Sequence, residues 1–160
     1  MSAIKTIRIS PQEMKSTFIK KLMVFDFSAE DAEKCATIFT ENSLDGVYSH
    51  GVNRFPRFVD YLKRGLVLPK NKPQLKKQMG VIEQWDGAMG AGPLNAFFAT
   101  NRALELAEEN GMGCIALSNT NHWMRGGYYG WQAAKKGYLY IGWTNTTAIM
   151  PAWGAQDSKL

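Results

Sequence analysis

The residues Gly113-Cys114-Ile115-Ala116-Leu117 form a short apolar run, and the polar residues Ser118-Asn119-Thr120-Asn121 follow it directly. A short continuous apolar run that ends in a polar turn is typical of a buried β-strand. Strand and helix patterns alternate around this run: strands at 81–85 and 138–144, and helices at 93–110 and 126–136. This alternation predicts an α/β layer.

The N-terminal part of the chain is predicted to be helical instead. Ser10-Pro11-Gln12-Glu13 has the capping residues of a helix start. Apolar residues then recur at helical spacing, and they do so again from 52 to 63. The lysine- and proline-rich segment from Pro69 to Gln78 is predicted to be an exposed connector. We therefore expect a helical N-terminal region at 1–70 and an α/β domain at 71–160.

The composition is that of an ordinary soluble globular protein. The 160 residues are 45% hydrophobic and 21% charged, with a formal net charge of +5. The N-terminus lacks the apolar core of a secretory signal, and no apolar run is long enough to cross a bilayer. The lysines are spread along the chain rather than gathered with aromatic residues, which disfavours binding to nucleic acid. We therefore expect a cytoplasmic protein with neither a membrane nor a nucleic acid as its partner.

The sequence has two histidines, and an arginine follows each of them closely. The first lies in Ser49-His50-Gly51-Val52-Asn53-Arg54. If this segment is helical, His50 and Arg54 are four residues apart and share one face. Imidazole transfers protons near neutral pH, and guanidinium binds a carboxylate through two parallel hydrogen bonds, so the pair would suit the reduction of a 2-keto acid. The alternative is a surface histidine at a helix N-terminus that Ser49 caps.

The second histidine follows the apolar run quoted above, in Asn121-His122-Trp123-Met124-Arg125-Gly126-Gly127. Open α/β sheets bind their ligands just past the carboxyl ends of their strands. The alternative for His122 is a turn that polar side chains stabilise. Thr144-Asn145 ends the last predicted strand, where its polar groups can bind a ligand or simply form a turn. The glycine-rich segment 87–92 lacks the spacing of a phosphate loop and is predicted to be a turn.

Three of these segments together resemble the type-2 malate/L-lactate dehydrogenase family, which is separate from the Rossmann lactate dehydrogenases. They are Ser49–Pro56, Asn121–Gly127, and Thr144-Asn145 followed by Pro151-Ala152-Trp153-Gly154. The resemblance extends from residue 11 to residue 157 and is strongest to the sugar-acid branch of the family. It implies a fold in which helices flank a mixed sheet and the N-terminus adds a helical region.

The resemblance implies an NAD(P)-dependent oxidoreductase that interconverts 2-keto and 2-hydroxy acids as a cytoplasmic homodimer. The expected substrate is a 2-keto sugar acid of the 2,3-diketo-L-gulonate type. The expected cofactor is NADH, with NADPH as the alternative. No metal is expected.

The same resemblance implies roles for individual residues. His50 matches the proton donor of the sugar-acid branch, and His122 matches a second active-site histidine that other branches use as acid and base. Both histidines are therefore candidates for the proton donor. Arg54 matches the arginine that holds the substrate carboxylate, and Ser49 is expected to contact the substrate beside it. Two further residues are expected to contact the cofactor: Thr144 and Asn145.

Members of the family are longer than this chain and continue past the Pro151–Gly154 segment with a G-T-N-P motif. The resemblance therefore implies the N-terminal half of an enzyme, with an incomplete sheet and with most nicotinamide contacts located after residue 160. The alternative is an inactive fragment that folds or dimerises without catalysis.

Overall fold

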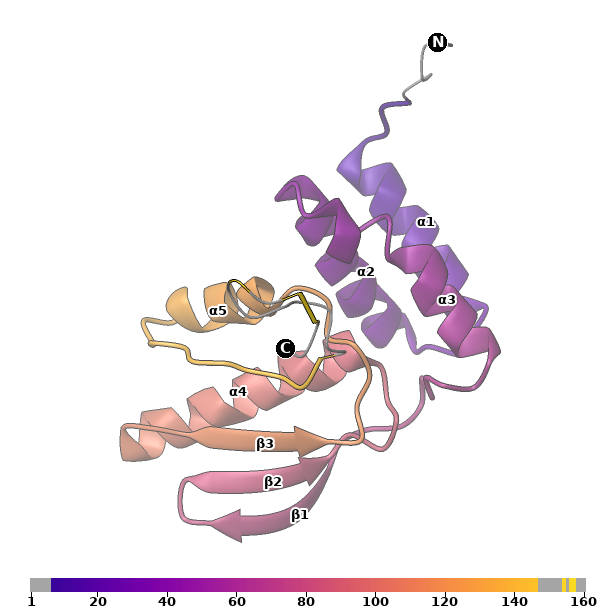
Figure 1. Ribbon diagram of the computed structural model, residues 1–160. Helices are drawn as coiled ribbons and strands as arrows, with labels where there is room; N and C mark the ends of the chain where they lie inside the picture. Colours follow the sequence, from indigo (N-terminus) through magenta and orange to yellow (C-terminus); the bar gives the residue numbers. More distant parts are fainter. Residues whose placement is uncertain (1–6, 147–153, 155, 158–160) are drawn as a thin grey trace.

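The computed structural model describes residues 7–146, 154 and 156–157, in which a group of helices precedes a small sheet and its covering helices (Figure 1). The helices are α1 (Pro11–Met23), α2 (Ala29–Leu44), a 3-10 helix (Tyr48–His50), α3 (Phe55–Lys63), α4 (Gly92–Asn110) and α5 (Gly126–Ala134). The strands are β1 (Gln74–Met79), β2 (Ile82–Asp86) and β3 (Cys114–Ser118). The predicted α/β class with a helical N-terminal region is confirmed.

The first helix begins where its capping sequence predicts. The Ser10 hydroxyl accepts a hydrogen bond from the Glu13 backbone N–H at 3.1 Å, and Pro11 occupies the first turn. Ser28 caps α2 in the same way, by accepting from the Asp31 N–H at 3.1 Å. Both caps satisfy backbone donors that a helix start leaves free.

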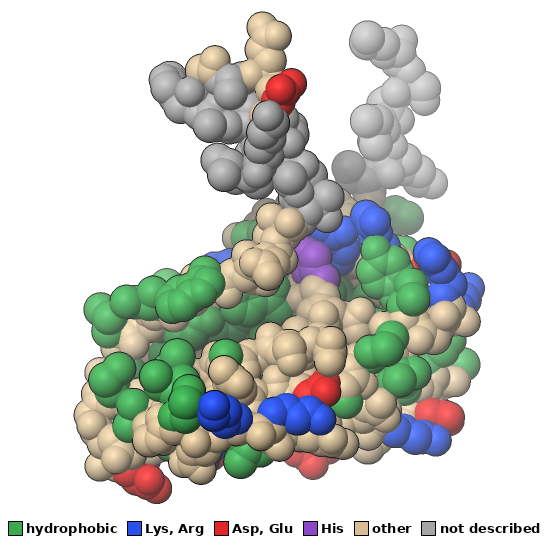
Figure 2. All heavy atoms as spheres, turned by 60° about the horizontal axis from the view of Figure 1, so that its bottom comes forward, with side chains coloured by type: hydrophobic (Ala, Val, Ile, Leu, Met, Phe, Trp, Pro, Cys, Tyr) green, Lys and Arg blue, Asp and Glu red, His purple; other side chains and the backbone are tan. Residues whose placement is uncertain are grey.

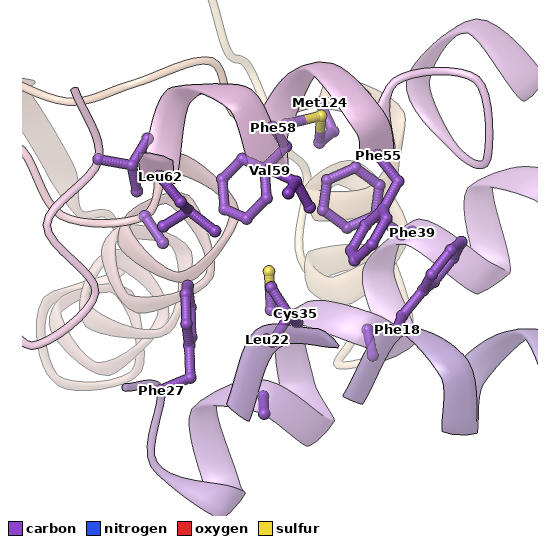
Figure 3. Packing of buried hydrophobic residues seen from close by; sticks show 14 residues of the cluster. Phe18, Leu22, Phe27, Cys35, Phe39, Phe55, Phe58, Val59, Leu62 and Met124 are labelled. Carbon is purple, nitrogen blue, oxygen red and sulfur yellow. The ribbon is translucent and has the colours of Figure 1, made fainter. Parts of the chain in front are cut away.

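A core of phenylalanines joins α1, α2 and α3 (Figure 3). The rings of Phe18 and Phe55 stack with their centroids 4.0 Å apart, and Phe39 meets Phe55 edge-on at 5.1 Å. Met124, which is far away in the sequence, is buried in this same core. Ala91 also comes from the α/β part, so two residues of that part share the core of the helical region. The division at residue 70 stays a prediction.

The sheet is mixed and has the order β1-β2-β3. β1 pairs with β2 antiparallel, and β2 pairs with β3 parallel. Helix α4 covers one face, where Trp85 meets Phe98 edge-on with centroids 4.7 Å apart. Buried Glu83 lies on this face too and accepts hydrogen bonds from Arg102 and from the Trp85 indole N–H. The carboxylate is thus paired despite its burial.

Two predictions about the sheet are wrong. The second half of the predicted connector is exposed as expected, but with Met79 it forms the strand β1 (Gln74–Met79). This strand lacks apolar alternation, and the turn at Gly80 (φ +59°) connects it to its partner β2. Residues 138–146 have no regular secondary structure, although 138–144 was predicted to be a strand. A strand needs a neighbour for its backbone hydrogen bonds, and no other strand pairs with this segment among the described residues.

The apolar run that we expected to be a buried strand is only partly buried. Cys114, Ile115 and Leu117 are half-buried, and Ala116 and Ser118 are exposed. The reason is that α4 covers one face of β3, whereas a parallel strand buried on both faces needs helices on each. None of the described helices is long and apolar enough to cross a membrane.

Candidate active site

The fold brings the two histidines together. His50 ends the 3-10 helix after α2, and His122 lies in the loop after β3. Their ring centroids are 5.5 Å apart, and the ring planes are inclined by 46°. Figure 2 shows a histidine at the surface next to basic side chains. The structure thus places the two motifs that were separate in the sequence in one location.

The His50 segment is held against the C-terminal half of α2. The Asn42 amide donates to the His50 carbonyl oxygen at 3.1 Å, and the Val52 N–H donates to the Ser43 hydroxyl at 2.9 Å. Asn42 and Ser43 are buried. A Cβ atom at Gly51 would collide with the Ser43 side chain, so the close approach requires glycine here. Sequence reasoning missed these positioning residues, although polar residues in a helix that otherwise buries apolar ones were a usable signal.

The condition for a shared helical face of His50 and Arg54 is not met, and the alternative is not observed either, because no side chain caps α3. Gly51 has φ −116° and ψ −122°, which interrupts the helix, and α3 begins only at Phe55 with Arg54 flanking its N-terminus. The contact of Gly51 with α2 imposes this break. Arg54 nevertheless lies close enough for its charge to lower the pKa of both histidines.

The His122 loop is fixed by hydrogen bonds to its neighbours. The Asn121 amide donates to the carbonyl oxygens of Met89 and Gly90 at 3.2 and 3.1 Å. On the other side of His122, the buried Tyr129 hydroxyl donates to the Trp123 carbonyl oxygen at 2.6 Å. The loop therefore has a defined shape on both sides of the imidazole.

The start of α5 also connects this loop to α2. The Arg125 guanidinium forms an ion pair with the Asp45 carboxylate, just after the end of α2. Tyr128 forms a hydrogen bond with Glu41, and burial together with that carboxylate raises the pKa of Tyr128 to about 12. Helix α2 thus supports both histidine segments.

Hydrogen bonding distinguishes the two imidazoles. Nδ1 of His122 accepts from the Met124 N–H at 2.9 Å, so a neutral His122 carries its proton on Nε2. If Nδ1 were protonated, its N–H would face the Met124 N–H, and neither group could accept a hydrogen bond from the other. Nδ1 of His50 lies 2.9 Å from the Ser49 hydroxyl, which can donate or accept. His50 can therefore hold a hydrogen bond in its neutral and its protonated form, whereas His122 is favoured only as the neutral form.

Electrostatics reinforce this difference. The pKa of His122 is lowered to about 4 by partial desolvation, the largest cause, together with the charges of Arg54, His50 and Arg57, although the residue keeps exposed surface. Desolvation and the Arg54 charge also lower the pKa of His50. The Nε of Arg54 is buried without a hydrogen-bond partner among the described residues. A buried guanidinium N–H without an acceptor indicates a place for an anion.

The predicted cofactor contacts are not joined to the histidine pair by a hydrogen bond within the described residues. Thr144 and Asn145 are both exposed, and Thr144 Oγ1 donates locally to the Asn145 carbonyl oxygen at 3.4 Å. Of the Pro151–Gly154 segment, only Gly154 belongs to the described residues. The cofactor role of Thr144 and Asn145 stays a prediction.

The glycine-rich loop after β2 forms a turn, as predicted. Its backbone N–H groups at Gly87, Ala88 and Met89 donate to acceptors within the protein, each at 2.8 Å. The Gly90 N–H donates to the Gly87 carbonyl oxygen, and Pro93 has no N–H. These four N–H groups are thus occupied within the protein, which agrees with the predicted turn.

A family model and individual relatives both match this chain, and they point to the same family. A family model described as malate/L-lactate dehydrogenase matches residues 9–160. The chain is 47% identical over 154 residues to the 2,3-diketo-L-gulonate reductase of Salmonella newport (strain SL254), covering 96% of this chain and 46% of that protein. It is 48% identical over 154 residues to the protein of the same name from Mannheimia succiniciproducens, with the same coverage. The chain spans about half the length of these curated relatives.

Solved structures agree with the sequence comparison. Malate dehydrogenase from Pyrococcus horikoshii OT3 superposes with a TM-score of 0.79 at 30% identity, over 82% of this chain and 38% of that chain. Sulfolactate dehydrogenase from Methanocaldococcus jannaschii superposes with a TM-score of 0.79 at 32% identity, over 81% of this chain and 38% of that chain. The fold resembles the corresponding part of these larger proteins.

Proposed function

The chain belongs to the malate/L-lactate dehydrogenase family, and from this membership and the histidine pair we propose that it forms the N-terminal part of a 2-keto-acid reductase. The proposed substrate is a sugar acid of the 2,3-diketo-L-gulonate type, in line with the names of the relatives quoted above. The observation that carries the proposal is the pairing of His50 with His122 near Arg54, whose buried Nε has no hydrogen-bond partner among the described residues. Together these groups suit a 2-keto acid, because the arginine can bind its carboxylate and a histidine can give a proton to the oxygen of its keto group.

Arg54 binds the substrate carboxylate in this proposal. Its buried Nε has no acceptor within the described residues, and a carboxylate would provide one in a bidentate, charge-assisted contact. The exposed Ser49 hydroxyl lies beside His50 and contributes a further hydrogen-bonding group to the substrate. The carboxylate thereby fixes the position of the adjacent keto group relative to the imidazoles.

His50 gives the proton to the substrate oxygen, and His122 donates a hydrogen bond to it from Nε2 as a neutral group. This division follows from the Nδ1 contacts, because only His50 keeps a hydrogen bond in both protonation states. A bound carboxylate would offset the Arg54 charge that lowers the pKa of His50. Substrate binding would then raise the pKa of the proton donor toward the working pH.

A nicotinamide cofactor supplies the hydride when it is bound, and NADH is the proposed form, with NADPH as the alternative. The chain matches only 46% of the length of these relatives, and we assign most of the cofactor contacts to the part that it does not match. Thr144 and Asn145 are the contacts proposed from this chain. A cytoplasmic homodimer is proposed on the family resemblance.

A chimeric enzyme tests the proposal. The 154 matched residues of the Mannheimia relative are replaced by the corresponding residues of this chain. We expect the chimera to oxidise NADH when 2,3-diketo-L-gulonate is added, and we expect His50→Gln to reduce kcat by roughly two orders of magnitude or more, as loss of an acid catalyst does. The measurement is the loss of NADH absorbance in both proteins.

The control separates catalysis from folding. NADH binding, followed by its fluorescence, should be equal in the chimera and in its His50→Gln variant. A chimera that binds NADH and turns over no 2-keto acid would contradict the proposed function. If His50→Gln keeps its kcat and His122→Gln loses it, then His122 and not His50 is the proton donor.

A further inference from the structure

The segment 138–144 has one side seated on the protein and one side uncovered (Figure 1). Tyr140 is half-buried, and its side chain lies next to Gly130 of α5 and next to Gly142. Its hydroxyl forms a hydrogen bond with Thr100 of α4. The apolar side chains at the alternate positions are exposed instead, Leu139 by 89%, Ile141 by 73% and Trp143 by 80%. Side chains of an extended segment alternate between two faces, so these three form one uncovered apolar face.

The backbone of the same segment has no neighbouring strand among the described residues. Residues 139–143 form no backbone-to-backbone hydrogen bond within the described part of the chain, although their apolar alternation is that of a strand. Strand β3 also has a free edge, since it pairs only with β2 in the described sheet. Unpaired N–H and C=O groups of an extended segment can bind a further strand. Both the side chains and the backbone of this segment therefore lack a partner.

The comparisons indicate which partner fits this surface. The chain matches 46% of the length of the Mannheimia relative, and it superposes on 38% of the Pyrococcus malate dehydrogenase chain with a TM-score of 0.79. More than half of each of these proteins thus lies outside the part that this chain matches. Contiguous apolar surface marks a place where another polypeptide packs. The unmatched part of the same fold is a polypeptide that such a surface fits.

We propose that residues 138–144 pair as a strand with the part of the family fold that this chain does not match, and that Leu139, Ile141 and Trp143 pack against that part. Pairing needs contact and not a covalent connection, so the unmatched part binds as a separate polypeptide. The inference rests on the proposed function in taking the chain as one part of a larger enzyme. It depends neither on the reaction nor on the roles of the histidines.

Co-expression with the unmatched part of the Mannheimia relative tests this pairing. The 160-residue chain carries an affinity tag, and the untagged partner is quantified after capture. We expect a complex with one copy of each polypeptide, as measured by size-exclusion chromatography with light scattering. Ile141→Glu and Trp143→Glu should each retain less than about one tenth of the partner, because the interface would then bury a carboxylate without a counter-ion. No capture by the unmodified chain overturns the proposal.

Val24→Glu is the matched control for Ile141→Glu. Val24 is also a β-branched residue, is 71% exposed, and lies just after α1. This variant should capture the partner as the unmodified chain does. An equal loss in Val24→Glu overturns the proposal, because added negative charge would then account for the effect. The urea denaturation midpoints of all three variants should match that of the unmodified chain, since the substituted residues are exposed.

Hydrogen exchange tests the strand itself. The amides of residues 139–143 should exchange rapidly in the chain alone and at least about tenfold more slowly in the complex, because strand pairing protects backbone N–H groups. Unchanged exchange in the complex overturns the strand pairing. If the chain alone forms a dimer that Trp143→Glu dissociates, then a second copy occupies this face and the proposal is overturned.

Failure of the pairing and failure of the proposed function give different results. A complex that forms but oxidises no NADH with 2,3-diketo-L-gulonate supports the pairing and counts against the proposed function. An active chimera, together with no capture of the separate partner, supports the proposed function and overturns the pairing.

Discussion

The backbone N–H of Met124 determines the chemistry available to His122. By donating to Nδ1 it places the neutral imidazole proton on Nε2 and opposes the imidazolium form. The Ser49 hydroxyl imposes no such restriction on His50. Two identical side chains, 5.5 Å apart, thus acquire different proton affinities from their immediate neighbours.

We predict that the two imidazoles titrate separately. His122 should remain neutral until the pH falls to about 4, and His50 should titrate below the ordinary histidine value. The measurement is the chemical shift of each Cε1–H signal as a function of pH, assigned with His50→Gln. A signal of His122 that titrates at its ordinary value would contradict the desolvated, arginine-flanked site.

His122 should also make stability depend on pH. In the unfolded chain its pKa returns to 6.5, so between pH 6.5 and about 4 the unfolded state binds a proton that the folded state does not. The free energy of unfolding should therefore fall as the pH is lowered through this window. His122→Gln should lose less stability between neutral pH and about pH 4.5 than the unmodified chain, as measured by urea denaturation. Equal losses would argue against the lowered pKa.

Among the elements, α2 has the central position in the site. Its buried Asn42 and Ser43 hold the His50 segment, while Glu41 and Asp45 contact the start of α5. A helix that supports two separate loops fixes the distance between them. In the sequence, the sign of this role is that Asn42 and Ser43 are polar residues in a helix that otherwise buries apolar ones.

The contact of Gly51 with α2 can be tested by adding a single methyl group. Gly51→Ala would collide with Ser43 and should lower the free energy of unfolding by about 1–3 kcal/mol, the cost of overpacking. Gly130→Ala is the matched control, because Gly130 is in α5 and a Cβ there makes only an ordinary contact with Tyr140. It should stabilise the chain by roughly 0.5–1 kcal/mol through helix propensity. Both values come from urea denaturation, and a neutral Gly51→Ala would refute the close packing.

On the scale of the whole molecule, Met124 connects the two parts of the fold. It follows β3 in the sequence, yet it is 3% exposed among the phenylalanines of the N-terminal helices (Figure 3). His122 lies two residues before it, so the packing of this methionine draws the His122 loop toward α2 and α3. Formation of the site and packing of the helical core are therefore coupled.

We predict that Met124→Ala lowers the free energy of unfolding by about 2–5 kcal/mol, the usual cost of truncating a buried methionine. Met112→Ala is its control, because Met112 is 60% exposed and should change stability by less than about 0.5 kcal/mol. The imidazole resonances should shift in the first variant and not in the second. If Met124→Ala is destabilised but its histidine signals do not shift, then the site does not depend on the packing of the helical core.

Local features of the fold could be read from the sequence because they depend on neighbouring residues. The Ser10 and Ser28 caps act within one helical turn, and the alternation of strands and helices follows from the side-chain period. β1 could not be recognised, since an exposed edge strand has no apolar alternation and forms only because a hairpin returns it to β2. Residues 138–144 show the opposite case: their sequence has a strand pattern, but they form no strand because no neighbouring strand pairs with them among the described residues.

For the site, the sequence by itself determined which residue types are available: two histidines, each followed by an arginine, in segments that resemble one family. Only the tertiary structure decided how these groups act. The approach of His50 to His122 and the burial of the Arg54 Nε, which has no partner among the described residues, depend on packing between residues far apart in the chain. The proton position on His122 depends on the folded shape of its loop. Periodicity and capping are short-range effects, whereas desolvation and charge coupling depend on distances that exist only once the core has formed.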